Sequence, residues 1–165
     1  MINLKQLRLL FIAIVAVGLV GCTSIADQQV RANSGEIKPI WIVNKSYSTN
    51  YVDGIQIDMS IINLSPKTIK YATLYMMPFN PVGDVIVSEI GGKSLAAVEI
   101  VGPFEPSYQA NFSWENVWYH SVFDCYEIER IEIEYMDSTE LMLNKSEVSK
   151  VLMDSTNELI SNSCT

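Results

Sequence analysis

Gly54-Ile55-Gln56-Ile57-Asp58-Met59-Ser60-Ile61 is the stretch that decides the fold class of this 165-residue chain. Apolar side chains at 55, 57, 59 and 61 alternate with polar ones at 56, 58 and 60. Successive side chains of a strand point to opposite faces, so this pattern predicts a strand with one face on a core and the other in water.

Similar strand patterns recur on both sides of this segment, separated by turn residues such as Asn80-Pro81-Val82-Gly83. No long helical segment lies between them to make the crossovers that a parallel sheet needs, so we predict antiparallel all-β structure in two packed sheets. Trp114 continues an alternating run and is assigned to the core, and a break is expected at Glu115-Asn116. The predicted strands are Ile37–Val43, Gly54–Ile61, Thr68–Phe79, Asp84–Ser88, Leu95–Val101, Tyr108–Trp114, Ile131–Tyr135 and Glu140–Leu143.

The last part of the chain changes period. Val148, Val151 and Leu152 fall on one helical face with Leu159 and Ile160, and Asn144 followed by Glu147 has the form of a capping box. We therefore expect one short amphipathic helix, at about 146–160, packed on an edge or end of the sandwich.

The first residues have the layout of a removable export signal. Lys5 and Arg8 precede an apolar run from Leu9 to Val20, and the small residue Gly21 stands before Cys22. A membrane anchor helix is the alternative interpretation, but the apolar run is shorter than the ~20 residues that a membrane span needs.

Leu19-Val20-Gly21-Cys22 resembles the bacterial lipobox. The resemblance implies that residues 1–21 are removed as a lipoprotein signal peptide and that Cys22 carries a diacylglyceryl group and an amide-linked chain such as palmitate. No other cofactor is expected. Residues 22–36 are polar and small and predict a flexible tether to the domain at 37–165. Thr23, where an inner-membrane protein would have Asp, resembles an outer-membrane sorting signal, with the domain in the periplasm or at the surface.

The charge of the exported part argues against nucleic acid as a partner. Removing Lys5 and Arg8 with the signal leaves nine basic and nineteen acidic residues. Such a body is repelled by phosphates and by anionic lipid headgroups. The membrane is therefore a partner through the lipid anchor, and the domain is expected to bind another envelope protein; a small-molecule ligand is left open.

The stretch Gly54–Phe112 resembles the FxLYD-type domains of bacterial exported proteins. The resemblance is carried by Ile61-Ile62-Asn63-Leu64-Ser65, by the strand and turn Tyr75-Met76-Met77-Pro78-Phe79-Asn80-Pro81-Val82-Gly83, and by Gly102-Pro103-Phe104-Glu105-Pro106 before Phe112. It implies an Ig-like sandwich. Together with the helix expected from the C-terminal pattern, the predicted fold is all-β, an Ig-like antiparallel β-sandwich of about seven to eight strands with a short C-terminal α-helix. The resemblance brings no active site with it.

Cys125 and Cys164 remain once Cys22 is lipidated. In an oxidising envelope the two could form a disulfide, or they could be separate buried thiols. Sequence does not decide between these, because a disulfide needs Cα atoms within ~7 Å of each other.

Catalytic and metal-binding chemistry finds little support in the sequence. His120 is the single histidine, so a Ser/His/Asp or Cys/His site would have to use it, and no nucleophile motif accompanies it. Glu132 and Glu134 lie on one face of a strand and could recruit calcium, but a solvated strand face is the favoured interpretation. We expect no catalytic residue and no metal site.

Trp118, Tyr119 and His120 form the candidate partner-binding surface. If the strand resumes after Glu115-Asn116, either Trp118 or Tyr119 must point outward. The leading hypothesis is a non-enzymatic, lipid-anchored Ig-like binding module, either an accessory subunit or a ligand-binding module. The alternative is an envelope inhibitor or protector that binds an enzyme, and a hydrolase is a third, weaker hypothesis.

Overall fold

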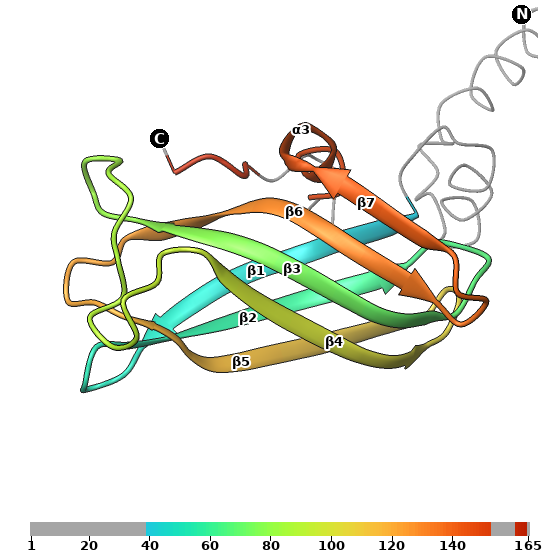
Figure 1. Ribbon diagram of the computed structural model, residues 1–165, viewed down its shortest axis with the longest axis horizontal. Coiled ribbons are helices and arrows are strands. Elements are labelled where there is room, and N and C mark those ends of the chain that lie inside the picture. The colour runs from blue at the N-terminus through green and yellow to red at the C-terminus, as the bar shows by residue number, and fades with distance from the viewer. Residues whose placement is uncertain (1–38, 153–160, 165) are drawn as a thin grey trace, which may run out of the picture.

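The computed structural model describes residues 39–152 and 161–164, which form two antiparallel sheets packed face to face (Figure 1). The first sheet has the order β1-β2-β5 and contains β1 (Ile40–Thr49), β2 (Gly54–Asn63) and β5 (Gln109–Tyr119). The second has the order β4-β3-β6-β7 and contains β3 (Ile69–Phe79), β4 (Ala96–Phe104), β6 (Cys125–Tyr135) and β7 (Glu140–Asn144). The predicted antiparallel all-β sandwich is confirmed.

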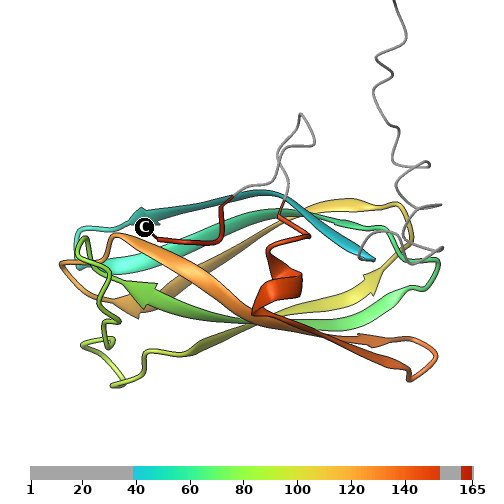
Figure 2. The same ribbon diagram turned by 90° about the horizontal axis from the view of Figure 1, so that it is seen from above.

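The strand order leaves two unpaired edges beside each other. In a constant-type immunoglobulin domain the fourth strand lies beside the fifth, whereas here β4 pairs with β3 and β5 pairs with β2. As a result, β4 and β5 are edge strands of opposite sheets and contact each other along one side of the sandwich. Figure 2 shows the two sheets as separate layers.

The alternating stretch in β2 forms the centre of the core, as its pattern predicted. Its four apolar side chains are almost fully buried, at 2% exposure or less, between the two sheets. Ile57 lies opposite Trp114 of β5 and Tyr47 of β1, which places it in the middle strand of its sheet.

Replacing Ile57 with Ala is expected to lower the free energy of unfolding by about 2 to 5 kcal/mol, because it leaves a cavity in a closely packed core. Gln56→Ala is the matched control on the other face of β2, where the side chain is half-buried and donates hydrogen bonds to Asp58, and its effect is expected to stay within about 0.5 kcal/mol. Urea unfolding followed by circular dichroism measures both. Equal losses would show that the faces of β2 are assigned wrongly.

Several predicted strands were wrong in extent: β4 continues to Phe104 instead of Val101, and β6 begins at Cys125 instead of Ile131. Two further predictions also failed. β1 starts at Ile40 and continues to Thr49, six residues beyond the predicted end, because its polar second half pairs with β2 from Lys45 to Thr49. Asp84–Ser88 forms no strand and contributes one bridge between Phe79 and Val85. Backbone pairing and not side-chain alternation sets both boundaries.

The expected break at Glu115-Asn116 is a bulge inside one strand. β5 runs through the bulge to Tyr119. The pairing register between β2 and β5 shifts there: Ile57 pairs with Trp114, whereas Ile55 pairs with Trp118. Asn116 has a left-handed backbone with φ of 56°, a conformation that Asn adopts more readily than most residues. Because four positions of β5 oppose two of β2 across the bulge, Trp118 stays on the core face with Trp114, and Tyr119 is half-buried.

The C-terminal helix is shorter in its described part than the sequence predicted. The helix α3 covers only Lys145–Val148. The capping box is present, with the Asn144 side chain accepting from the backbone of Glu147 and the Glu147 carboxylate accepting from the backbone of Asn144. Beyond α3 the chain joins β1: the Ile42 amide donates to Val151, and Leu152 bridges to Ile42. The rest of the expected helix, 153–160, lies outside the described residues.

The expected signal peptide at 1–21 and tether at 22–36 also lie outside the described residues. Within 39–152 and 161–164, none of the helices has both the length and the apolar character needed to cross a membrane. Cys22 and its lipid therefore stay predictions from the sequence.

Candidate functional site: the distal loop surface

Strand direction gathers three connections at one end of the sandwich. The β1–β2 turn (50–53), the β3–β4 connection (80–95) and the β5–β6 connection (120–124) lie together there (Figure 1). Ile40, where β1 begins, lies at the opposite end. We call the end with the three connections the distal end, since it is remote from the N-terminal start of the domain.

The distal end carries just over half of the exposed large apolar side chains among the described residues, including the two most exposed. Tyr51 is 98% exposed, Val82 80% and Ile90 63%. Single exposed apolar residues are ordinary, but several on neighbouring loops are typical of an interaction site. The distal surface consists of Tyr51, Val52, Val82, Val85, Val87, Ile90 and Val122.

Asparagine side chains shape two of these loops. Asn50 accepts hydrogen bonds from the backbone amides of Val52 and Gly54 through its side-chain oxygen. Asn80 does the same for Val82 and Asp84. Asn folds a turn in this way by replacing a backbone acceptor, so Tyr51 and Val82 are displayed at the tips of defined turns.

Hydrogen bonds also join the loops to one another. The Tyr119 amide donates to the Ser88 hydroxyl at 3.0 Å, and the Glu89 amide donates to the Tyr119 carbonyl at 2.8 Å. The His120 amide donates to the Asp53 carbonyl at 3.0 Å. These bonds connect all three loops, and a surface held in place before binding loses less entropy when a partner docks.

The structure separates the three predicted partner-binding residues. Trp118 is 1% exposed: it points into the core, where it stacks on Phe123 and donates its indole N–H to the Ser94 carbonyl at 2.7 Å. Its side chain is therefore removed from the candidate surface. Tyr119 and His120 are half-buried at the distal end, as supports of its loops.

His120 takes part in loop structure. Its Nδ1 accepts a hydrogen bond from the Val122 amide at 3.2 Å and lies 4.0 Å from a carboxylate oxygen of Glu89. One ring nitrogen is thus engaged with the backbone of its own loop, and the carboxylate is at the limit of ion-pair distance.

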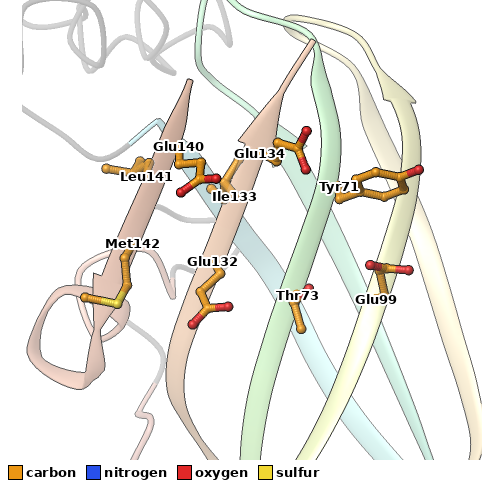
Figure 3. A pocket seen from close by; sticks show the side chains of 9 residues that line it. All are labelled: Tyr71, Thr73, Glu99, Glu132, Ile133, Glu134, Glu140, Leu141 and Met142. Atoms are coloured by element: carbon orange, nitrogen blue, oxygen red, sulfur yellow. The ribbon is translucent and has the colours of Figure 1, made fainter. Parts of the chain in front are cut away.

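The acidic face of the second sheet forms a shallow hollow, with side chains contributed by β3, β4, β6 and β7 (Figure 3). Glu134 is paired with Lys70 at 2.7 Å. The Tyr75 hydroxyl and the Arg130 guanidinium both donate to Glu132 and hold the pKa of its carboxyl below the usual range. Within 39–152 and 161–164, no group of three or more potential metal ligands comes together. The arrangement is that of a solvated, ion-paired strand face.

A second constellation, the tail clamp, fixes the C-terminal segment to β6. Cys125 and Cys164 are joined by a disulfide, with Cα atoms 5.8 Å apart. The Asn162 side chain accepts from the Ile128 amide and donates to the Ile128 carbonyl, both at 2.9 Å, as a neighbouring strand would. β7 reaches only to the level of Arg130, so Asn162 replaces it further along β6.

Glu127 completes the tail clamp electrostatically. Its carboxylate accepts from the Cys164 amide at 3.0 Å and pairs with Lys145 at 2.6 Å. Burial opposes ionisation of Glu127, but these two partners and the nearby Lys45 outweigh it and lower its pKa. Burial also lowers the pKa of Lys45, against the attraction of Glu127. The sequence pointed to the cysteines but carried no signal for Asn162 or Glu127.

Reducing the disulfide is expected to release the tail before the sheets unfold. Chain entropy assigns ~3 to 4 kcal/mol of stabilisation to a disulfide that closes a loop with a sequence separation of 39. Because the tail is released locally, the loss in the free energy of global unfolding is expected to be smaller than that value. Hydrogen exchange of the Ile128 amide, with and without a phosphine reductant, measures the release. Cys164→Ser should reproduce it; unchanged protection of Ile128 in both cases would refute the clamp.

Comparison of the chain with models of protein families and with curated protein sequences finds no match in either. The fold and the exposed loops define its class: a small antiparallel β-sandwich that presents connected apolar loops at one end.

Proposed function

We propose that this protein is a lipid-anchored, non-enzymatic lipoprotein of the bacterial envelope whose β-sandwich binds another envelope protein through the distal surface. The observation that carries the proposal is the concentration of exposed apolar side chains on three connected loops, led by Tyr51, Val82 and Ile90. Apolar and aromatic side chains at the centre of an interface supply most of the binding energy.

The position of the loops suits an anchored binding module. The lipobox-like segment precedes the domain, and β1 begins at the end opposite the distal surface. A lipid on Cys22 would hold the chain at its N-terminal side, and the tether at 22–36 would leave the distal surface free to meet a partner. Repulsion between the acidic body and anionic headgroups keeps the domain off the membrane, so its loops stay accessible.

The test is affinity isolation of the lipidated chain from gently solubilised native membranes. The proposal predicts a stoichiometric protein partner that is lost with Val82→Asp and with Ile90→Asp, because each change places a charge in an apolar interface. Met136→Asp is the matched control: Met136 is 59% exposed in the β6–β7 turn, at the other end of the sandwich.

The outcome also separates the two kinds of partner. A membrane assembly supports an accessory subunit, and a single soluble enzyme supports an inhibitor or protector. A partner that survives both aspartate substitutions but is lost with Met136→Asp would contradict the distal surface as the binding site.

A further inference from the structure

The unpaired edges of β4 and β5 enclose an apolar groove that adjoins the distal surface. The groove has a volume of about 630 Å³, within the ~300–1,000 Å³ range of ligand sites. Trp118 forms its buried floor, Trp114 and Val117 form a half-buried wall, and Leu95 and Ile90 are exposed at its rim. Ile90 belongs to both the groove and the distal surface.

The floor and wall of the groove are fixed before any partner arrives. Both indole N–H groups donate to backbone carbonyls on the β4 side, Trp114 to Glu99 at 3.2 Å and Trp118 to Ser94 at 2.7 Å. Their polar atoms are satisfied, so the half-buried Trp114 ring presents apolar surface to the groove above the buried Trp118. The same bonds occupy two acceptors on the β4 side of the groove.

Apart from Tyr119, whose backbone is bonded to Ser88 and Glu89, the edge of β5 stays open for a polypeptide backbone. Among the described strands, β5 pairs only with β2, and no strand pairs with its second edge. An extended segment can add to such an edge through main-chain hydrogen bonds and place alternate side chains in a neighbouring pocket.

The charges around the groove select the kind of segment. Glu99 and Glu115 are exposed among its lining residues, against one cation, Lys93. A segment with basic residues beside its apolar ones is attracted, and an acidic one is repelled.

From these observations we infer that the groove between β4 and β5 binds an extended, apolar polypeptide segment flanked by Lys or Arg, contributed by the envelope partner. The inference rests on the proposed function and names the part of the partner that gives specificity.

The test uses two fluorescein-labelled peptides, Lys-Ile-Thr-Val-Thr-Ile-Lys and its counterpart with Glu at both ends, and the lipidated chain in detergent micelles. Fluorescence anisotropy is expected to show that the lysine peptide binds about fivefold or more tightly than the glutamate peptide. The double variant Glu99→Lys with Glu115→Lys is expected to reverse this preference, while its thermal unfolding stays that of the parent chain.

Val82→Asp separates this inference from the proposed function, because Val82 does not line the groove. It is expected to leave the affinity for the lysine peptide unchanged while it removes the envelope partner. If the chain captures a partner through the distal surface but binds neither peptide, the groove is not the peptide-binding site, and the proposed function still holds. If the double charge-reversal variant still prefers the lysine peptide, the groove is likewise excluded as the peptide-binding site.

Discussion

Trp118→Ala is expected to lower the free energy of unfolding by about 3 to 5 kcal/mol, the range for removing a buried Trp from a core. The Trp118 ring on β5 is 1% exposed and contacts the rings of Phe123 and Tyr126. Truncation leaves a cavity and also removes the donor to the Ser94 carbonyl. The loss therefore combines packing with an unsatisfied backbone acceptor.

Tyr51→Ala is the matched control for this substitution. Tyr51 is an aromatic residue of the same end of the sandwich but is 98% exposed, so its replacement is expected to change stability by no more than about 0.5 kcal/mol. Urea unfolding followed by circular dichroism compares the two without relying on tryptophan fluorescence. If Trp118→Ala were as mild as Tyr51→Ala, the tryptophan would have to lie on the surface.

Cys22→Ser is expected to abolish lipidation completely, because the thioether to diacylglycerol can form only on sulfur. The precursor should keep residues 1–21 and lose the labelled fatty acid that the parent chain takes up. Metabolic labelling with palmitate, followed by intact mass, measures both effects. Cys164→Ser serves as the control, since it removes a cysteine without touching the lipobox-like segment and should stay labelled.

A labelled Cys22→Ser variant would contradict the anchor. Membrane fractionation of the parent chain tests the sorting expectation drawn from Thr23, which places the protein in the outer membrane. Recovery in the inner membrane would reject that expectation and leave lipidation intact.

Side-chain alternation predicted the core of this fold well, because burial on one face of a strand leaves a period of two in the sequence. β2, most of β3 and parts of β5 and β6 follow from it. It failed where backbone pairing decides instead: the polar half of β1 pairs with β2 without any apolar pattern, and Val85 and Val87 alternate in a loop that makes one bridge.

The candidate site was harder to predict from sequence than the core. The sequence does not distinguish an apolar residue that is exposed from one that is buried, so Trp118 and Val82 could not be assigned to the core or to the surface. Trp118 keeps the core face of Trp114 because β5 continues through the bulge at Asn116, and Val85 and Val87 are exposed in a loop that forms no strand. Tertiary pairing decides both, and so it also decides which residues could meet a partner.

If the proposed function holds, the distal end meets the partner and the other end does not. A photo-crosslinking amino acid at Val82, which is 80% exposed, can be compared with one at Met136, which is 59% exposed at the opposite end, in living cells with the lipidated chain. We expect one dominant protein adduct from position 82, which is lost when Ile90 is replaced by Asp, and no adduct of the same mass from position 136. Equal adducts from both positions, or adducts from position 136 alone, would contradict the proposed function.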